Sequence, residues 1–361
     1  MTEDLVDQVY DLQMEAYELP YGEPRLHMLK EALRMAEQSR DLETIFLSKI
    51  YVADSAASAG YEEETMAILA WCLATFNENE EELREHVFDL LFLFKNFLNS
   101  VDVFPKVTQR QFDQLLGQME TMCHRFGYNQ RPVHFTRLAF ALGIGDRAMA
   151  QESHAKYLAI PRDDMAHCIA CEANREVSYF NFLEEPEKAI KSAAKILSGA
   201  QSCGHVPNTT FNNLLRTLAI LERYEEADNY QKRGYRMIRT NRTYLYQIAC
   251  QIAYLIHRDR TVAAIRMFER HLAWALTTHE LSNRYAFYIV AKHLFASLPK
   301  KKPTRKLSLP LSFHLYEESR DYEVAKLIGW LEEETSELAA AFDQRNGNNY
   351  FSVELPKQFI Y

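Results

Sequence analysis

The 361-residue chain has few of the residues that make tight turns. Glycine and proline number 11 each, roughly 3% apiece against average usages of about 7% and 5%. Sandwiches, barrels and glycine-rich nucleotide-binding folds need many such turns, so this scarcity argues against them. It favours a chain built almost entirely of helices.

Long apolar runs and export signals are also missing from the sequence. The longest apolar run, residues 67–76, is well short of the roughly 20 residues that a membrane-spanning helix needs. The acidic opening MTEDLVDQVYDLQ has no cationic segment leading into an apolar one, unlike a signal peptide. We therefore expect a cytoplasmic protein with no membrane partner.

A disulfide scaffold is missing as well, because the six cysteines lie inside helical patterns and lack the density of such a scaffold. One group is a candidate for zinc: His167, Cys168 and Cys171 would share a helix face, and Cys203 and His205 follow about one helix pair later. Zinc takes four such ligands, and a single helical C-x-x-C is a weak signal for it. We expect reduced thiols in ordinary packing, with no metal and no cofactor; structural zinc and redox chemistry are the alternatives.

Motifs of catalysis and nucleotide binding are absent from the sequence. It contains no G-x-S-x-G, no Walker loop, no H-E-x-x-H and no G-x-G-x-x-G pattern. The fragment Gly143-Ile144-Gly145 has no third glycine and no strand before it, so it indicates a helix break. We expect the protein not to be an enzyme.

Apolar residues recur with helical spacing along nearly the whole chain. Residues 211–224 and 244–257 each show an apolar stripe at i, i+3, i+4 and i+7. Ala189, Ala227 and Ala264, which open corresponding helices, lie 38 and 37 residues apart. A period of this length is typical of stacked helix pairs, in which neighbouring pairs share a continuous core.

The pattern predicts three parts. Residues 1–20 form an acidic amphipathic cap, 21–345 form the helical repeat domain, and 346–361 form an irregular C-terminal tail that is extended or disordered. Within the repeat domain we place helix pairs at 24–58, 61–99, 108–142, 145–182, 185–222, 224–257, 259–297 and 310–345.

Two junctions between helices resemble those of a known family. Tyr224-Glu225-Glu226-Ala227 and Asp321-Tyr322-Glu323-Val324-Ala325 resemble the turn of tetratricopeptide repeats, where Tyr-Glu-Glu-Ala opens the second helix of each pair. The resemblance covers residues 40–345. It implies an all-α, right-handed superhelix of stacked antiparallel helix pairs, a TPR-like solenoid. In that family the first helices line a concave groove, and their Asn, Arg and Lys side chains hold extended peptides or carboxylates.

The polar faces of the expected first helices supply candidates for such a groove. The resemblance implies that these side chains contact a peptide, and a merely solvated helix face is the alternative. The groove candidates are Arg175, Thr209, Asn213, Arg216, Gln247, Tyr254, Arg284 and Lys292.

Positive charge is concentrated in one section of a chain whose net charge is −9. Residues 223–306 hold 17 Lys and Arg against 6 Asp and Glu, and we name them the basic section. Such a block raises the local concentration of an acidic partner. It can instead dock on the acidic residues 1–222 of the same chain, or on those of a second copy in a homodimer. The candidate basic patch is Arg233, Arg236, Arg239, Arg242, Lys300, Lys301 and Lys302.

These features favour a non-catalytic scaffold or regulator that binds a protein or peptide, acidic in character, in a concave helical groove. A nucleic-acid-binding helical repeat that uses the basic section is one alternative. The sequence argues against it, because aromatic residues are not regularly interleaved with the basic ones as in single-strand binders. A metal-dependent or enzymatic helical domain is the other alternative.

Overall fold

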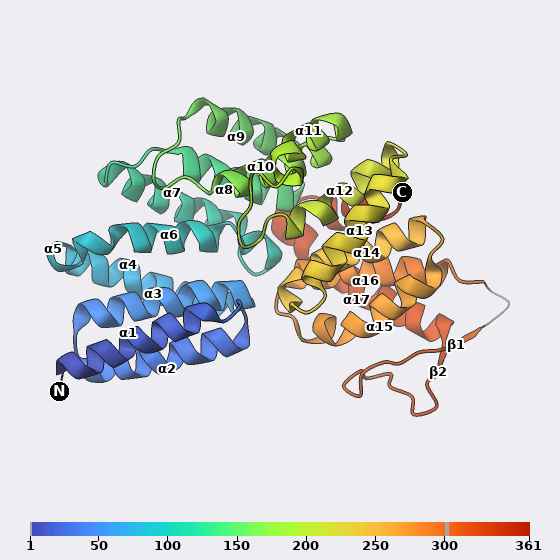
Figure 1. The fold of residues 1–361 in the computed structure, drawn as a ribbon, viewed down its shortest axis with the longest axis horizontal. Helices are drawn as coiled ribbons and strands as arrows, with labels where there is room; N and C mark the ends of the chain where they lie inside the picture. The colour runs from blue at the N-terminus through green and yellow to red at the C-terminus, as the bar shows by residue number, and fades with distance from the viewer. Residues whose placement is uncertain (1, 300–302) are drawn as a thin grey trace. The chain divides into compact units, whose positions relative to one another are not determined.

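The computed structural model describes residues 2–299 and 303–361, and almost all of them lie in helices (Figure 1). The prediction of an all-α fold of stacked helices is confirmed: the described residues form seventeen α-helices and a single two-stranded hairpin. The chain divides into two compact units. Unit 1 comprises Met1–Asp102, Gln109–Phe140 and Gln151–Ala166; unit 2 comprises Val103–Thr108, Ala141–Ala150 and His167–Tyr361.

Unit 1 is a series of helices in which each packs on the next. Ala16 of the first helix, Leu26 and Leu29 of the second, and Val52 and Ala56 of the third form one buried cluster. The elements are α1 (Thr2–Glu18), α2 (Glu23–Ser39), α3 (Leu42–Ala59), α4 (Glu62–Glu78), α5 (Glu80–Leu83), η1 (Arg84–His86), α6 (Val87–Leu98), η2 (Val101–Val103) and α7 (Gln109–Arg125). The residues of η2 and of two further helices, α8 (Arg131–Ile144) and α9 (Arg147–Ala159), are divided between the two units.

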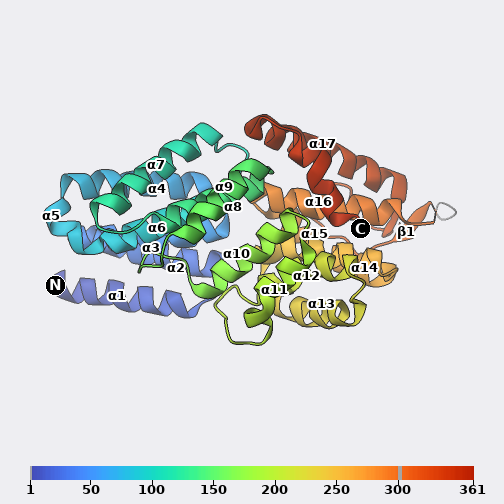
Figure 2. The ribbon, with the colours of Figure 1, turned by 90° about the horizontal axis from the view of Figure 1, so that it is seen from above.

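Unit 2 has two rows of helices. One row, which we name the first helices, runs α10, α12, α14, α16, each in contact with the next; α11, α13 and α15 pack beside them. The long helix α17 lies along α16 (Figure 2). The elements are α10 (Ile169–Phe182), α11 (Pro186–Leu197), α12 (Asn208–Ile220), α13 (Tyr224–Ile238), η3 (Arg242–Tyr244), α14 (Leu245–His257), α15 (Thr261–Thr277), α16 (Leu281–Ala296), β1 (Thr304–Lys306), β2 (Asp321–Glu323), α17 (Val324–Asn346), η4 (Tyr350–Glu354) and η5 (Leu355–Phe359).

The same turn follows three of the first helices in unit 2. One residue adopts a left-handed backbone conformation, and the N–H of the residue after it donates to the carbonyl five positions back, at 2.8 or 2.9 Å. This bonding closes the end of a helix and reverses the chain. An alanine with no exposed surface follows five residues later, because the two helices meet closely there. The turn residues are Glu184, Glu222 and Asp259, and the alanines are Ala189, Ala227 and Ala264.

The prediction of a helix pair at 310–345 is wrong for its first helix. Instead of that helix the chain forms a hairpin, in which β1 pairs with β2 in antiparallel register and Arg305 lies opposite Tyr322. The two strands are joined by a loop that buries Leu307, Leu309 and Phe313. The junction at Asp321–Glu323 is therefore a strand that leads into α17, and not a turn between two helices. Pro303 and Pro310 interrupt the helical pattern, because proline cannot donate the backbone hydrogen bond of a helix interior.

No helix within residues 2–299 and 303–361 is long and apolar enough to cross a bilayer.

Candidate functional site

The residues after α17 fold onto the row of first helices instead of forming an extended or disordered tail. They make a π-helical turn, η4, and a 3₁₀ turn, η5, and η5 contacts both α14 and α16. Phe351, Leu355 and Phe359 are buried there. We refer to residues 349–361 as the docked segment, and the surface that receives it is the candidate site.

One end of the docked segment is fixed by backbone hydrogen bonds. The carboxylate of Asp343, on α17, accepts from the N–H groups of Phe351 at 2.8 Å and Ser352 at 3.0 Å. The carbonyl of Phe351 accepts from the buried hydroxyl of Tyr285, on α16. The ring of Phe351 stacks on Phe342, with centroids 4.1 Å apart. These contacts satisfy backbone groups that a helix end leaves without partners.

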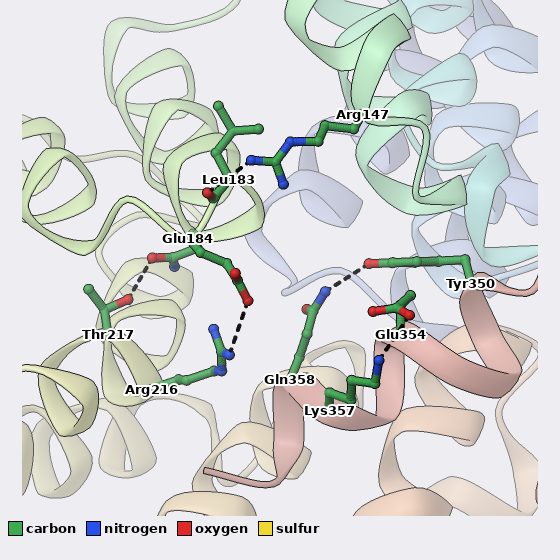
Figure 3. A network of polar contacts seen from close by, with 10 residues as sticks. Arg147, Leu183, Glu184, Arg216, Thr217, Tyr350, Glu354, Lys357 and Gln358 are labelled. Carbon is green, nitrogen blue, oxygen red and sulfur yellow. Dashed lines mark hydrogen bonds and ion pairs between the residues drawn. The ribbon is translucent and has the colours of Figure 1, made fainter.

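Tyr350 anchors the same end on the other side. Its ring meets Phe182 of α10 edge to face, with centroids 6.3 Å apart. Its hydroxyl accepts a hydrogen bond of 2.9 Å from the side-chain amide of Gln358, within the docked segment (Figure 3). Glu354 and Lys357 form an ion pair of 2.9 Å along the same stretch. The segment therefore combines aromatic anchors with polar contacts of its own.

Two aromatic residues hold the far end of the docked segment. The ring of Phe359 packs edge to face on Tyr246, and the ring of Tyr361 lies 5.0 Å from that of His257. His257 Nδ1 also hydrogen-bonds the backbone oxygen of Tyr361. Burial raises the pKa of Tyr361, whose phenol lies among charges that include Arg216. The segment thus reaches from α16 across α14 towards α12.

The structure places two groove candidates beside this docked segment and gives each an intramolecular partner. Arg216 lies 3.9 Å from the carboxylate of Glu184 (Figure 3). Tyr254 is fully buried, and its hydroxyl donates to Asp228 at 2.7 Å. Burial is the largest cause that raises the pKa of Tyr254, and the Asp228 carboxylate adds to it. Tyr254 therefore belongs to the core and not to an open surface.

Other groove candidates make contacts within the stack. The side chain of Asn213 donates to Ser178 at 3.4 Å, and its carbonyl accepts from Asn181 at 2.8 Å. Thr209 donates to a carbonyl of its own turn, and Arg284 donates to the carbonyl of Thr278 at 2.5 Å. The remaining candidates, all partly exposed on first helices, are Arg175, Gln247 and Lys292.

Polar residues that the sequence analysis did not single out connect three helices of unit 2. Gln251 of α14 donates to Asn212 of α12 at 2.5 Å and accepts from Gln231 of α13 at 2.8 Å. All three are buried. Gly234 lies against these side chains: a Cβ built on it would be 3.3 Å from Asn212 Oδ1 and 3.3 Å from Gln251 Nε2. The signal in the sequence that could have identified this group is a polar residue, such as Gln251, among apolar residues of helical spacing.

The basic patch lies partly on α13. Arg233, Arg236 and Arg239 are exposed; Arg233 also lies over the ring of Phe211 at 4.7 Å, and Arg242 donates to Thr277. Lys300, Lys301 and Lys302 lie outside the described residues.

Other charges of the basic section are neutralised within it. Asp228 accepts from Arg260 at 2.5 Å and lies 3.9 Å from Arg258. Burial alone would raise the pKa of Asp228, but hydrogen bonds from Tyr254 and Arg260 lower it. Arg236 on α13 and Arg239, which caps the end of that helix, take no part in these ion pairs with Asp228.

Three of the six cysteines come together where α10 begins. The Sγ atoms of Cys171 and Cys203 are 3.5 Å apart, and those of Cys168, Cys171 and Cys203 all lie within 4.8 Å of one another. Burial acts to raise the pKa of Cys168, but hydrogen bonds that involve Cys171 and Cys203 lower it. By contrast, Cys72 and Cys123 are buried thiols whose pKa is raised to about 12, chiefly by burial.

The two histidines that the sequence placed near these thiols are not part of the group. His205 Nδ1 lies 3.4 Å from the hydroxyl of Tyr244, at the start of α14. No protein-family model matches the chain, and no curated protein matches it. The described residues form a helical repeat-like stack of neighbouring helices.

Proposed function

We propose that the chain is a non-catalytic binding scaffold, in which the first helices of unit 2 receive a short segment of a partner protein. The observation that carries this proposal is the docked segment itself. Residues 349–361 use buried aromatic anchors and backbone hydrogen bonds on this surface. Interfaces draw most of their binding energy from a few such anchors in pockets.

We also infer that the repeat is of the tetratricopeptide-like class. Tyr224-Glu225-Glu226-Ala227 begins two residues after the left-handed turn at Glu222, and Ala227 is buried. A stack of rigid pairs supports this function because its binding surface is formed before the partner arrives, which lowers the entropy cost of binding.

An acidic partner fits the charge of unit 2. The exposed Arg236 and Arg239 belong to a section with 17 cationic and 6 anionic residues. Their field would act on the rate of encounter more than on the strength of the final contacts. The six free cysteines, of which Cys168 is exposed, support a reducing compartment such as the cytoplasm.

The test uses a fluorescent peptide with the sequence of residues 349–361 and the full-length chain. Phe351→Ala together with Phe359→Ala weakens the docking of the chain's own segment, since both side chains are buried. This double variant should bind the labelled peptide more tightly than the natural chain does, because competition within the molecule is reduced. Fluorescence anisotropy measures the affinity.

The matched control changes the exposed Val353 to Ala in the same segment. It should leave the peptide affinity at the natural level, and a scrambled peptide should not bind either protein. A double variant that is folded by circular dichroism but does not bind the native peptide would contradict the proposal.

A further inference from the structure

The three clustered thiols have the arrangement of a soft-metal site. Zn–S bonds are about 2.3 Å long, which in a tetrahedral site places the sulfur atoms about 3.8 Å apart. The Sγ atoms of Cys171 and Cys203 are separated by 3.5 Å, and that of Cys168 lies within 4.8 Å of both. All three Sγ atoms can therefore bind one ion if each moves by between a few tenths of an ångström and about 1 Å.

The backbone positions these thiols from two separate segments. Cys168 is the N-cap of α10, with φ −59° and ψ 149°, and its sulfur accepts from the N–H of Cys171 at 3.3 Å. Cys203 lies in the loop before α12. There its N–H donates to Val206 at 2.9 Å, and the N–H of Val206 donates back to it at 3.3 Å. Each segment is therefore a closed turn that presents its sulfur from a fixed backbone.

Burial distinguishes this group from cysteines that only fill a core. Cys168 is exposed and Cys171 and Cys203 are half-buried, whereas Cys72 and Cys123 have no exposed surface. Cys203 packs against the buried Ala170, Ile196 and Val206, but apolar packing alone does not require three sulfurs to converge. Their convergence does bring together ligands that zinc prefers, and a surface location lets the ion enter.

We propose that Cys168, Cys171 and Cys203 bind one Zn²⁺ ion as thiolates, with a nitrogen or oxygen ligand in the fourth position. Binding releases the thiol protons to solvent and leaves the ion divalent, so no oxidant or reductant is needed. This inference departs from the expectation of no metal, which rested on the lack of a second C-x-x-C in the sequence. It is independent of the proposed function, because no residue of the docked segment takes part.

Such an ion would join two successive helix pairs. Its ligands Cys171 and Cys203 are 32 residues apart and flank the whole of α11. The bond would hold the start of α10 to the loop that leads into α12. Zinc would therefore stabilise the stack at this point, in the manner of structural zinc sites.

The experiment measures metal in the full-length chain, expressed with zinc in the medium and purified without chelators. Elemental analysis should find one zinc ion per chain, and X-ray absorption at the zinc edge should show three sulfur ligands. Cys168→Ser, Cys171→Ser and Cys203→Ser should each lose most of the zinc. The matched control Cys250→Ala, which changes a half-buried cysteine on α14, should retain it.

Each contrary outcome overturns the proposal. These outcomes are a chain without zinc, zinc retained in all three serine variants, copper in place of zinc, or fewer than three sulfur ligands. A thiol count of four instead of six in the denatured, unreduced chain would show a disulfide and would also overturn it. Because the absorption spectrum is measured on the natural chain, the test holds even if a serine variant does not fold.

Discussion

Gly145 and Tyr350, 205 positions apart in the chain, are in contact so close that no side chain fits between them. A Cβ built on Gly145 would lie 2.3 Å from two ring carbons of Tyr350. Gly145 also has φ +77°, in the left-handed region that favours glycine. The turn between α8 and α9 is therefore shaped to receive the docked segment.

Gly145→Ala should displace Tyr350 and loosen the docked segment. The backbone conformation alone costs about 1 kcal/mol, and the clash with a ring adds to it, since real Cβ atoms do not approach to 2.3 Å. We expect a lower melting temperature and faster proteolysis within 349–361. Gly199→Ala is the control, because Gly199 has φ +80° but no heavy atom within 4 Å of a built Cβ. Equal losses in the two variants would contradict a specific contact with Tyr350.

Tyr285→Phe should destabilise the docked segment although it leaves the aromatic ring at this position in place. The substitution removes the hydroxyl that donates to the carbonyl of Phe351. A buried acceptor that loses its donor costs about 1–3 kcal/mol. Tyr288→Phe on the same helix is the comparison, because the buried Tyr288 makes no hydrogen bond to any described residue. Denaturant unfolding measures both, and a larger loss for Tyr288→Phe would show that the Tyr285 bond is unimportant.

His271 should make the protein less stable in mild acid. It is fully buried on α15, and burial, assisted by Arg270, lowers its pKa to about 4. The unfolded chain takes up this proton near pH 6.5, whereas the folded chain does not until about pH 4. Stability is therefore complete above about pH 6.5 and falls as the pH drops towards 4, by up to about 3 kcal/mol for this group.

The measurement for His271 is the urea midpoint at several pH values between 7 and 4. His271→Gln should reduce the loss of stability over this range relative to the natural chain. His279→Gln, which changes an exposed histidine beyond the end of the same helix, should leave the pH profile as it is. The same slope in all three proteins would mean that His271 is protonated in the folded state.

Arg236→Glu with Arg239→Glu should slow the association of an acidic ligand. The probe is the 349–361 peptide with a run of glutamates added, bound to the Phe351→Ala, Phe359→Ala chain. Long-range attraction is screened over about 8 Å at physiological ionic strength, so the rate should fall several-fold at low salt and depend less on salt. Lys191→Glu with Lys195→Glu, exposed on α11, is the control. Stopped-flow fluorescence that detects no difference between the two pairs would remove the steering role.

The repeat could be predicted from the sequence because the two helices of a pair pack closely, which requires a small residue five positions after each left-handed turn residue. The spacing of Ala189, Ala227 and Ala264 is the spacing of the left-handed turns that precede them. The β1–β2 hairpin was not readable, since its strands have three residues each and no alternating pattern develops over so short a length. A turn motif at Asp321–Glu323 therefore resembled a helix junction when it was a strand.

The candidate site was predicted less completely than the fold. Helical spacing identifies which side of a helix is polar, but not whether a neighbouring helix satisfies that side. Asn213 and Tyr254 were expected at a ligand surface, and they bond to Ser178 and Asp228 within the stack. The docked segment had no periodic signal because a π turn and a 3₁₀ turn of five residues each follow one another.

The recurrent left-handed turn gives the chain natural points for growth by duplication. A copy of residues 223–259 inserted after Asp259 would begin and end at equivalent turns, so each new junction would repeat one that already exists. The inserted pair would meet neighbours of the same shape on both sides. Insertions of other lengths would shift the buried alanine away from the helix crossing. The length of this chain can therefore change in steps of one helix pair, and each step would add or remove one helix of the row α10, α12, α14, α16.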